Sequence, residues 1–413
     1  MKSWNTPEMP QLSGHGPLPR IYNTSLGEIS SIEVDTEAQL YVCGITPYDA
    51  THIGHANTYL TYDTLNRVLR DAGITVSYVQ NVTDVDDPLL ERATATGVDW
   101  RELAESQIEL FRGDMKALGI IPPKHYVGVV ESVVEIGAAC ARLLDDGYAY
   151  WVPTDGGDPD LYFDLAAAQE RTTWYLGQES RLDRPTMLEL SAERGGDPAR
   201  PGKRDPLDPL LWRSAREGEP SWGTAIGSGR PGWHIECSVI GGHYLSAPIT
   251  VNGGGFDLVF PHHEMSAAHS AALNGSDWSH TYSHAGMVAY EGEKMSKSRG
   301  NLVFVSKLIA EGVDPRAIRL ALLAHHYRSD WEWTHSELHT AEARLKTWQE
   351  WAQSPFGHSG ALVAELRSLL ADDLNTPGAL AAVDAAITAG EKASPSDLDA
   401  ISALLGIGLH SAS

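Results

Sequence analysis

The order of apolar segments along this chain predicts an α/β fold, with a parallel sheet that is split by an insertion and followed by helices. Residues 39–44 and 74–82 are predicted strands, and residues 54–71 between them carry apolar side chains at helical spacing. Strand, helix and strand in this order make a βαβ unit, which implies parallel pairing in a Rossmann-like sheet. From residue 148 the pattern breaks up, and from residue 314 it becomes wholly helical.

Five segments are predicted from this pattern. The first thirty or so residues are rich in Pro, Gly and Ser and are expected to run extended over the surface. The expected boundaries are 1–147 for the first half of the sheet domain, 148–231 for the insertion, 232–290 for the second half, 291–330 for a loop and linker, and 331–413 for a C-terminal helical bundle. Helices are predicted over 100–118, 131–146, 232–245, from His262, 314–327, 335–353, 360–373, 377–390 and 396–407, and a further strand over 247–254.

The overall composition argues against several classes of protein. The 413 residues include 31 Lys and Arg against 55 Asp and Glu, a formal net charge of −24. Surfaces that bind nucleic acids are usually basic, so no nucleic-acid partner is expected. No apolar run approaches the roughly 20 residues of a membrane span, and the first residues lack the apolar stretch of a secretion signal. A cytoplasmic protein without membrane contact is therefore expected.

The segment THIGHANTY (51–59) places two histidines where the helix over 54–71 should begin. His52 and His55 flank Gly54, which lets a ligand approach the backbone closely. The backbone amides and the dipole at a helix N-terminus attract phosphate. Two histidines in an ordinary surface turn are the structural alternative. His52 and His55 are candidate catalytic residues.

The segment EKMSKSRGN (293–301) carries two lysines in a loop bounded by glycine. Lys294 and Lys297 suit a pyrophosphate leaving group, whose negative charge grows in the transition state. A solvated charged loop is the alternative for such a stretch. The histidine and lysine elements occur in this order on opposite halves of the α/β pattern, which favours a shared catalytic role for Lys294 and Lys297.

Cys43, Cys237 and His262 form a candidate metal site drawn from separated segments. Two thiolates and an imidazole are good Zn²⁺ ligands, and three protein ligands leave one tetrahedral position open. A substrate thiolate in that position would select cysteine over serine. The spacing is not that of a zinc finger, so two small buried cysteines and a helix-capping histidine are an open alternative. Cys140, in GAACARLL, is expected to be a buried small hydrophobe.

The histidine and lysine elements together resemble the signature of class I aminoacyl-tRNA synthetases. Eight blocks between about residue 20 and residue 390 are similar to the cysteinyl-tRNA synthetase series: CGITPYDATHIGHA, YVQNVTDVDD, KRDPLDPLLW, GEPSW, GRPGWHIECS, GGGFDLVFPHHE, GEKMSKSRGN and DDLNTP. The resemblance implies a class I catalytic domain that activates L-cysteine with ATP as a cysteinyl-adenylate. It also implies one Zn²⁺, held by Cys43, Cys237 and His262.

Several residues depart from the pattern of the tRNA enzymes. Ile45 and Pro47 change the family's CGPTVYD motif, and Asn252 replaces a histidine before the glycine run. Ser266 stands where the family has a fourth zinc-binding Glu. Glu264, in the shared HHE block, is expected to support the structure without binding the metal.

The C-terminal region and two further motifs resemble a related family. Residues 341–413 hold four Lys and Arg against nine Asp and Glu, whereas a domain that grips a tRNA should be basic. CGITPYDATHIGHA and ERGGDP (193–198) are similar to motifs of the mycothiol-pathway cysteine ligases. Members of that family keep the adenylation reaction and replace the tRNA hydroxyl with the amine of glucosaminyl-inositol.

The resemblance also implies a substrate pocket and a set of partners. Thr46 and Thr83 would hydrogen-bond the amino acid, Trp233 would wall its side chain, and Asp257 would accept the ribose hydroxyls. The full expected pocket consists of Cys43, Gly44, Ile45, Thr46, Thr58, Asn81, Val82, Thr83, Trp233, Gly255, Phe256, Asp257 and Val288. The implied partners are L-cysteine, ATP with Mg²⁺, and glucosaminyl-inositol, and a monomer is expected.

Two alternatives stay open at this point. Asp84, Asp86 and Asp87 could suggest a Mg²⁺ site, but an acidic run that complements a helix dipole explains them more simply. The chain could also be a cysteinyl-tRNA synthetase or a non-catalytic synthetase-like binding module. Intact histidine and lysine elements argue against the second of these.

Overall fold

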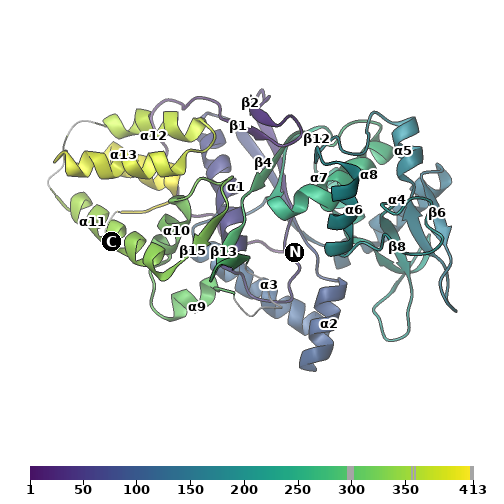
Figure 1. Cartoon of the computed structure of the whole chain (residues 1–413). Helices are drawn as coiled ribbons and strands as arrows, with labels where there is room; N and C mark the ends of the chain where they lie inside the picture. Colours follow the sequence, from purple (N-terminus) through teal and green to yellow (C-terminus); the bar gives the residue numbers. More distant parts are fainter. Residues whose placement is uncertain (295–301, 355–356, 358–359, 410–413) are drawn as a thin grey trace.

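The computed structural model describes residues 1–294, 302–354, 357 and 360–409 (Figure 1). Its centre is a five-stranded sheet in the order β12–β11–β3–β4–β5, and every neighbouring pair is parallel. The strands are β12 (Ser279–Ala285), β11 (Ile249–Gly255), β3 (Glu37–Val42), β4 (Thr75–Val82) and β5 (His125–Gly128). The α/β fold with a parallel sheet is therefore confirmed.

The two edge strands of this sheet were not predicted from the sequence. The pattern gave β3, β4 and β11, whose apolar residues pack on both faces of the sheet. β5 has only four residues, and β12 reads SHTYSHA, without an apolar run. The position of β12 is fixed instead by six register pairs with β11, and the sequence of β12 alone does not indicate this pairing.

Helix α1 (Ile53–Asp71) crosses from β3 to β4 and is buried along almost its whole length. The Tyr62 hydroxyl ties it to the sheet, because it accepts a hydrogen bond from the Gly254 amide at 2.8 Å and lies 2.5 Å from the Ser283 carbonyl oxygen. On its other side α1 contacts the C-terminal helices. The helix that begins at the two motif histidines is thus held between the sheet and the helical region (Figure 1).

The remaining helices of the catalytic region lie close to their predicted ranges, except for a helix over residues 87–96, for which no range was predicted. α4 packs on α7, and α7 packs on α8, so the second half of the fold closes over the sheet. These helices are α2 (Asp87–Thr96), α3 (Trp100–Ala117), α4 (Val129–Asp145), α7 (Trp233–Tyr244) and α8 (Glu264–Asn274). Two short turns, η1 (Phe256–Leu258) and η2 (Val259–His263), lead from β11 into α8.

The insertion folds as a separate antiparallel sheet in the order β6–β7–β8–β10–β9, seen on the right of Figure 1. Its strands are β6 (Ala149–Val152), β7 (Asp160–Phe163), β8 (Leu210–Ser214), β9 (Trp222–Thr224) and β10 (Gly227–Pro231). Two helices, α5 (Leu165–Arg171) and α6 (Arg184–Glu193), lie between β7 and β8. Most of its buried apolar residues share one hydrophobic core with α4, α7 and α8, while Tyr150, Val152 and Tyr162 form a small cluster of their own.

The C-terminal region is helical and packs on α1 (Figure 1). A small sheet, β14–β13–β15, precedes most of its helices. The elements are β13 (Val288–Tyr290), β14 (Glu293–Lys294), α9 (Val305–Ala310), α10 (Pro315–Leu323), β15 (Trp331–Trp333), α11 (His335–Ala352), α12 (Ala361–Ala371), α13 (Thr376–Thr388), α14 (Pro395–Ala400) and η4 (Ile401–Leu405). The helix predicted over 314–327 is shorter in the structure, because the chain turns after α10 to enter β15.

Three buried charged side chains join α1 to the C-terminal region. Asp63 accepts hydrogen bonds from Arg67 and Arg319, and all three side chains are at most 1% exposed. Arg319 also donates to the Leu405 carbonyl at 2.6 Å, and Arg67 to the Gly119 carbonyl at 2.7 Å. Burial alone would raise the pKa of Asp63, but the two guanidinium groups bring it below its ordinary value.

The N-terminal residues are more firmly attached than the sequence suggested. β1 (Arg20–Asn23) and β2 (Glu28–Ser31) pair as an antiparallel hairpin. Trp4 is only 7% exposed, stands edge-on to Phe111 and Tyr126, and donates to the Ile120 carbonyl at 2.7 Å. The expectation that this segment runs over the surface is wrong at Trp4, because a large aromatic ring gains most from burial.

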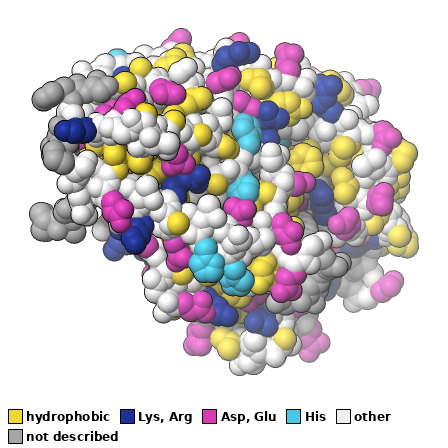
Figure 2. Space-filling view, turned by 60° about the vertical axis from the view of Figure 1, so that its left-hand side comes forward, with side chains coloured by type: hydrophobic (Ala, Val, Ile, Leu, Met, Phe, Trp, Pro, Cys, Tyr) yellow, Lys and Arg dark blue, Asp and Glu magenta, His cyan; other side chains and the backbone are white. Residues whose placement is uncertain are grey.

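None of the helices in the described part of the chain has the length and apolar character needed to cross a bilayer. Figure 2 shows the side on which the C-terminal helices lie. Among the described residues on this face, Lys and Arg side chains are scattered between Asp and Glu side chains and form no continuous basic strip.

Candidate active site

A cavity of about 640 Å³ opens between the ends of β3 and β11, the N-terminus of α7 and the insertion. A smaller one of about 290 Å³ adjoins it on the side of the α1 N-terminus and β13. The two cavities share the residues Thr46, Tyr48, His55, Thr58, Gly255 and Asp257. A single elongated ligand can therefore extend from one cavity into the other.

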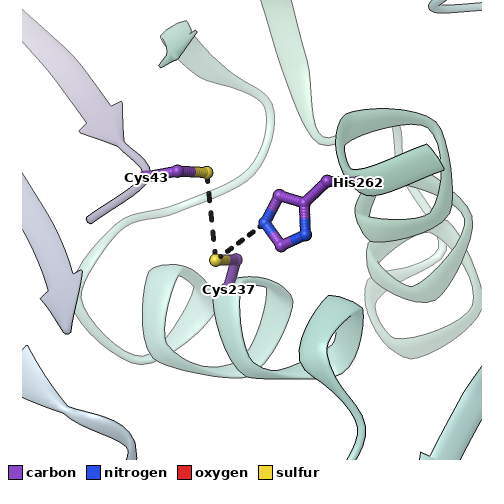
Figure 3. Close-up of side chains that lie close together, drawn as sticks. All are labelled: Cys43, Cys237 and His262. Atoms are coloured by element: carbon purple, nitrogen blue, oxygen red, sulfur yellow. Dashed lines mark hydrogen bonds between the residues drawn. The ribbon is translucent and has the colours of Figure 1, made fainter. Parts of the chain in front are cut away.

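The predicted metal ligands come together in the structure (Figure 3), and one of them, Cys43, lines the larger cavity. Cys43 Sγ lies 3.9 Å from Cys237 Sγ, and His262 Nε2 lies 3.2 Å from Cys237 Sγ. All three side chains are buried, and their donor atoms lie within 4.8 Å of one another. Cys43 follows β3, Cys237 is on α7 and His262 precedes α8, so this cluster exists only in the folded chain.

Neighbouring rings hold the histidine of this cluster in place. The Nδ1 atom of His262 lies 3.1 Å from Nδ1 of His234, which leaves Nε2 directed at Cys237. Trp233 stacks on the His262 ring with 4.4 Å between centroids. His263 lies beside the cluster, with its Nε2 3.3 Å from Cys43 Sγ and its Nδ1 2.8 Å from His284.

The chemistry of the three donors fits a soft or borderline divalent cation. Burial by itself raises the pKa of the Cys237 thiol, but hydrogen bonding with Cys43 and the charge of His262 bring it well below its ordinary value. Burial, together with Cys237, raises the pKa of Cys43. Two sulfurs and one imidazole nitrogen, shielded from water, are a donor set typical of Zn²⁺. The three predicted ligands therefore lie together in an arrangement that could hold a metal ion.

Glu264 and Ser266 point away from the two thiols. The Glu264 carboxylate accepts backbone hydrogen bonds from Gly177 at 2.9 Å, Glu179 at 3.2 Å and Ser180 at 2.8 Å. It therefore fixes a loop of the insertion, as expected for a structural role. The Ser266 hydroxyl donates to the His234 carbonyl at 3.0 Å and so supports the ring that faces His262.

The two motif histidines lie at the N-terminus of α1, as predicted. His52 caps the helix, and its Nδ1 accepts hydrogen bonds from the amides of Gly54 at 3.1 Å and His55 at 3.4 Å. A neutral imidazole that accepts hydrogen bonds at Nδ1 carries its proton on Nε2. Burial lowers the pKa of His55 to about 4, so this ring is neutral at pH 7, and the two rings stack at 3.8 Å.

Most of the predicted pocket residues line the two cavities. The larger cavity is lined by Cys43, Gly44, Ile45, Thr46, Thr58, Trp233, Gly255 and Asp257. The smaller is lined by Thr46, His52, His55, Thr58, Gly255, Asp257 and Val288. The structure thus brings the metal cluster, the helix N-terminus and β11 to one continuous space.

Four predicted pocket residues do not line either cavity. Asn81 is buried beneath the loop after β3, and its side-chain Oδ1 accepts a hydrogen bond from the Gly44 amide at 2.8 Å. The Thr83 hydroxyl donates to Glu236 at 3.1 Å, and Val82 is fully buried. Phe256 is 55% exposed. Substrate contact by these four residues stays a prediction.

The lysine element can be placed only in part. The backbone of Lys294 belongs to β14, where it pairs with Ala289 of β13. Lys297 lies outside the described residues. Where the described residues resume at position 302, the chain lies at the N-terminus of α1, because the Ile53 amide donates to the Val303 carbonyl at 2.9 Å. Catalysis by both lysines stays a prediction.

The acidic run before α2 contains the N-cap of that helix, as expected, and two of its members, Asp86 and Asp87, also line the larger cavity. Asp86 is the N-cap of α2 and accepts a hydrogen bond from the Asp87 amide, and Asp84 accepts one from the Val130 amide at 2.8 Å. Burial raises the pKa of both Asp84 and Asp86 to about 6. Cys140 is fully buried, as expected for a small hydrophobe.

The sequence did not reveal the wall that the insertion contributes to the larger cavity. Its lining residues include Tyr162, Ser191, Arg194, Gly195, Gly196, Asp197, Arg200 and Lys203. The ERGGDP motif had marked this segment without giving it a role. Because these residues lie more than 100 positions from Cys43 and the α1 N-terminus, only the tertiary structure brings them to the site.

Residues 29–343 match the family described as tRNA synthetases class I (C) catalytic domain. The chain is 59% identical to the L-cysteine:1D-myo-inositol 2-amino-2-deoxy-alpha-D-glucopyranoside ligase of Clavibacter michiganensis subsp. michiganensis, over 100% of this chain and 99% of that protein. It is 57% identical to the protein of the same name from Paenarthrobacter aurescens, over 99% of this chain and 100% of that protein.

Solved structures of similar fold are class I synthetases of low sequence identity. A Mycobacterium tuberculosis methionyl-tRNA synthetase in complex with methionyl-adenylate has a TM-score of 0.59 at 16% identity, covering 90% of this chain and 88% of that one. An Agrobacterium radiobacter LeuRS in a ternary complex gives 0.59 at 13% identity, covering 90% and 83%. At these identities the likeness concerns the fold alone.

Proposed function

Because the chain belongs to the family of L-cysteine:1D-myo-inositol 2-amino-2-deoxy-α-D-glucopyranoside ligases, built on a class I (C) tRNA synthetase catalytic domain, we propose that it joins L-cysteine to the amine of this amino sugar. The chain is an ATP-dependent ligase. The reaction would proceed through a cysteinyl-adenylate and release diphosphate and AMP.

The observation that carries the choice of cysteine is the metal-ligand cluster that borders the larger cavity. Cys43, Cys237 and His262 would hold Zn²⁺, and Cys43 itself lines the cavity, so the site opens toward a substrate. When bound, this Zn²⁺ would supply a Lewis-acidic position that prefers a substrate thiolate to a hydroxyl. Trp233, stacked on His262, would limit the space beside that side chain.

The N-terminus of α1 would orient the triphosphate during adenylation. The cysteine carboxylate attacks the α-phosphorus, a P–O bond forms, and the bond to diphosphate breaks. His52 would donate a hydrogen bond from Nε2, and neutral His55 would line the same space without adding charge. Lys294 and Lys297 would stabilise the leaving diphosphate. Asp257, with Gly255 beside it, would accept the ribose hydroxyls.

The second step transfers the cysteinyl group to nitrogen. The neutral amine of the sugar attacks the carbonyl carbon of the mixed anhydride, an amide bond forms, and AMP leaves with the electron pair of the broken C–O bond. The proton lost from the amine passes to solvent or to the departing phosphate. A neutral amine is nucleophilic enough that positioning can supply most of the acceleration.

The acidic total charge and the scattered Lys and Arg side chains of Figure 2 support an acceptor that is a small molecule and not a nucleic acid. We expect a monomer that acts in the cytoplasm, where ATP and cysteine are supplied.

Product analysis by mass spectrometry tests this function. Purified protein is incubated with L-cysteine, ATP and Mg²⁺, and either glucosaminyl-inositol or bulk tRNA is added as acceptor. We expect the cysteinyl amide, AMP and diphosphate with the amino sugar, and no charged tRNA. Serine in place of cysteine serves as the control for thiol recognition.

Cysteine-dependent exchange of diphosphate into ATP is measured on the same preparation. Exchange together with charging of tRNA and no amide would replace the ligase by a cysteinyl-tRNA synthetase. Absence of both exchange and product would contradict an enzymatic function altogether.

A further inference from the structure

One wall of the larger cavity has no role in the binding proposed above for cysteine, ATP and Zn²⁺. It is formed by the turn 194–197, which follows α6 in the insertion. Gly195 has φ +84°, and a side chain on Gly196 would come within 2.2 Å of Ser191 Oγ. Both positions therefore require glycine, and the main chain of the turn borders the cavity directly.

Arg194 fixes this turn to the nucleotide side of the site. Its guanidinium donates to the carbonyl of Asp257 and to the carbonyl of Phe260, both at 2.6 Å. Asp257 lines both cavities. The turn is thus attached to the main chain of η1, beside the place proposed for the ribose of the adenylate.

Asp197, the last residue of the turn, has a carboxylate that is held in one orientation and yet remains open. The Tyr162 hydroxyl donates to Oδ2, and Lys203 Nζ donates to Oδ1 at 2.9 Å. The Lys203 side chain is only 3% exposed, whereas that of Asp197 is 40% exposed and lines the cavity. Lys203 also donates to the Pro206 carbonyl at 2.7 Å, and this second hydrogen bond restricts the position of its ammonium group beside Asp197.

A second acidic residue stabilises the wall from behind. Arg200, which also lines the cavity, pairs with fully buried Asp160 at 2.8 Å. Its other nitrogen lies 3.9 Å from Asp197 Oδ2. The carboxylate of Asp197 therefore borders the cavity and is held by cationic partners that border it too. Each oxygen of an ionised carboxylate can accept more than one hydrogen bond, so this group can also accept hydroxyl groups of a ligand.

We propose that the turn 194–197 is the acceptor subsite, where the Asp197 carboxylate accepts hydrogen bonds from hydroxyl groups of the polyol acceptor and so orients its amine toward the adenylate. This inference rests on the proposed function. The cavity of about 640 Å³ falls in the range of roughly 300–1,000 Å³ that is typical of small-molecule sites. Tyr162 and Lys203 act as positioning residues for Asp197.

The variant Asp197→Asn tests the subsite, because the amide keeps the shape but loses the charge and one acceptor oxygen. We expect the KM for glucosaminyl-inositol in amide formation to rise on the order of 10-fold to 100-fold. Cysteine-dependent diphosphate exchange, which needs no acceptor, should stay within about twofold of the unaltered protein. Hydroxylamine, a nucleophile too small to use the subsite, should capture the adenylate equally well in both proteins.

Two further variants sharpen this test. Tyr162→Phe removes the donor to Asp197 Oδ2 while keeping the ring, so it should raise the same KM by a smaller factor. Glu189→Gln changes an exposed carboxylate on α6 that does not line the cavity, and should leave all three readouts unchanged.

An unchanged KM in Asp197→Asn would overturn the subsite, and so would an equal loss of exchange and amide formation. If the unaltered protein makes no amide from the amino sugar at all, the proposed function fails instead, whatever the variant does.

Discussion

The three cysteines occupy two different chemical environments. Cys43 and Cys237 lie in the cluster with His262, whereas Cys140 lies in the core with its Sγ 3.6 Å from the Leu211 carbonyl. Cys43→Ala and Cys237→Ala should therefore reduce the bound zinc from about one equivalent to near zero, because two ligands cannot replace three. Metal analysis of the purified variants measures this.

Cys140→Ala provides the matched control for these two variants. It removes a buried sulfur of the same kind and should retain the full metal content, at a cost of about 1 kcal/mol in the free energy of unfolding. Full zinc retention in Cys43→Ala or Cys237→Ala would show that the cluster is not the metal site.

Gly44 lies where the loop after β3 passes closest to β4. A Cβ atom at this position would lie 1.6 Å from the Asn81 carbonyl oxygen, so Gly44→Ala must displace the main chain next to Cys43. We expect a loss of at least about 2 kcal/mol in the free energy of unfolding, together with a loss of cysteine-dependent exchange. Urea unfolding and the exchange assay give the two values.

Gly113, in the middle of α3, is the appropriate comparison. A Cβ atom there meets nothing within 4 Å, so Gly113→Ala should leave exchange intact and increase the free energy of unfolding by about 0.5–1 kcal/mol. Equal unfolding midpoints for the two alanine variants would refute the close approach at Gly44.

Among the elements, α1 connects the active site to the C-terminal helices. Removing the Asp63 carboxylate would leave Arg67 and Arg319 buried without their shared partner. Asp63→Asn should reduce the free energy of unfolding by about 3–5 kcal/mol, as seen when one member of a buried charge cluster is lost. Chemical denaturation measures the change.

Glu109 on α3, an exposed carboxylate that pairs with the partly buried Arg112, controls for charge removal as such. Glu109→Gln should change the free energy of unfolding by no more than about 0.5 kcal/mol. If Asp63→Asn were as mild as Glu109→Gln, the cluster would not hold α1 to the C-terminal region.

Elements with strong local patterns were predictable, and those fixed by pairing were not. β3, α1 and β4 have apolar periodicity and a clear helix end at Gly73, and their predicted bounds agree with the structure to within two residues. β5 and β12 gain their positions from register with β4 and β11, so their sequences carry little signal. Helix ends near 323 and 400 depend on where the chain turns to meet other elements.

At the active site, residues with rare chemistry in specific motifs could be predicted from the sequence. Which other residues lie close to them could not be predicted. Cys43, Cys237, His52 and His55 could be selected because their chemistry is rare and their motifs are specific. Residues of the insertion wall such as Asp197 have ordinary chemistry, and only the fold brings them to the cavity. The same holds for Thr83, whose hydroxyl turns out to donate to Glu236 beneath the loop.

At the scale of the whole molecule, two hydrophobic cores meet at the sheet. One joins α1 to the C-terminal helices, and the other joins α4, α7 and α8 to the insertion. His269 lies fully buried in the second core, edge-on to Phe163 of the insertion at 4.6 Å. Burial lowers its pKa to about 3.

This buried histidine should make global stability depend on pH. Its pKa in the folded chain lies below the value of about 6.5 in an unfolded chain, so between these values only the unfolded state binds the proton. The free energy of unfolding should fall as the pH drops from about 7 to 5, by at most about 1.4 kcal/mol per pH unit from this group. Urea unfolding at several pH values measures the slope.

His269→Gln removes the titrating group and should flatten this slope, although other buried histidines such as His55 contribute to what remains. An unchanged slope in the variant would mean that His269 is protonated equally in the folded and unfolded chains.

The central claim is that the thiol of the substrate completes the coordination begun by Cys43, Cys237 and His262. Zinc K-edge X-ray absorption on the purified protein, with and without a non-hydrolysable cysteinyl sulfamoyl adenosine, tests it most directly. We predict two sulfur neighbours at about 2.3 Å without the analogue and a third when it binds. The same sulfur count in both samples, or no bound zinc in either, would contradict the claim.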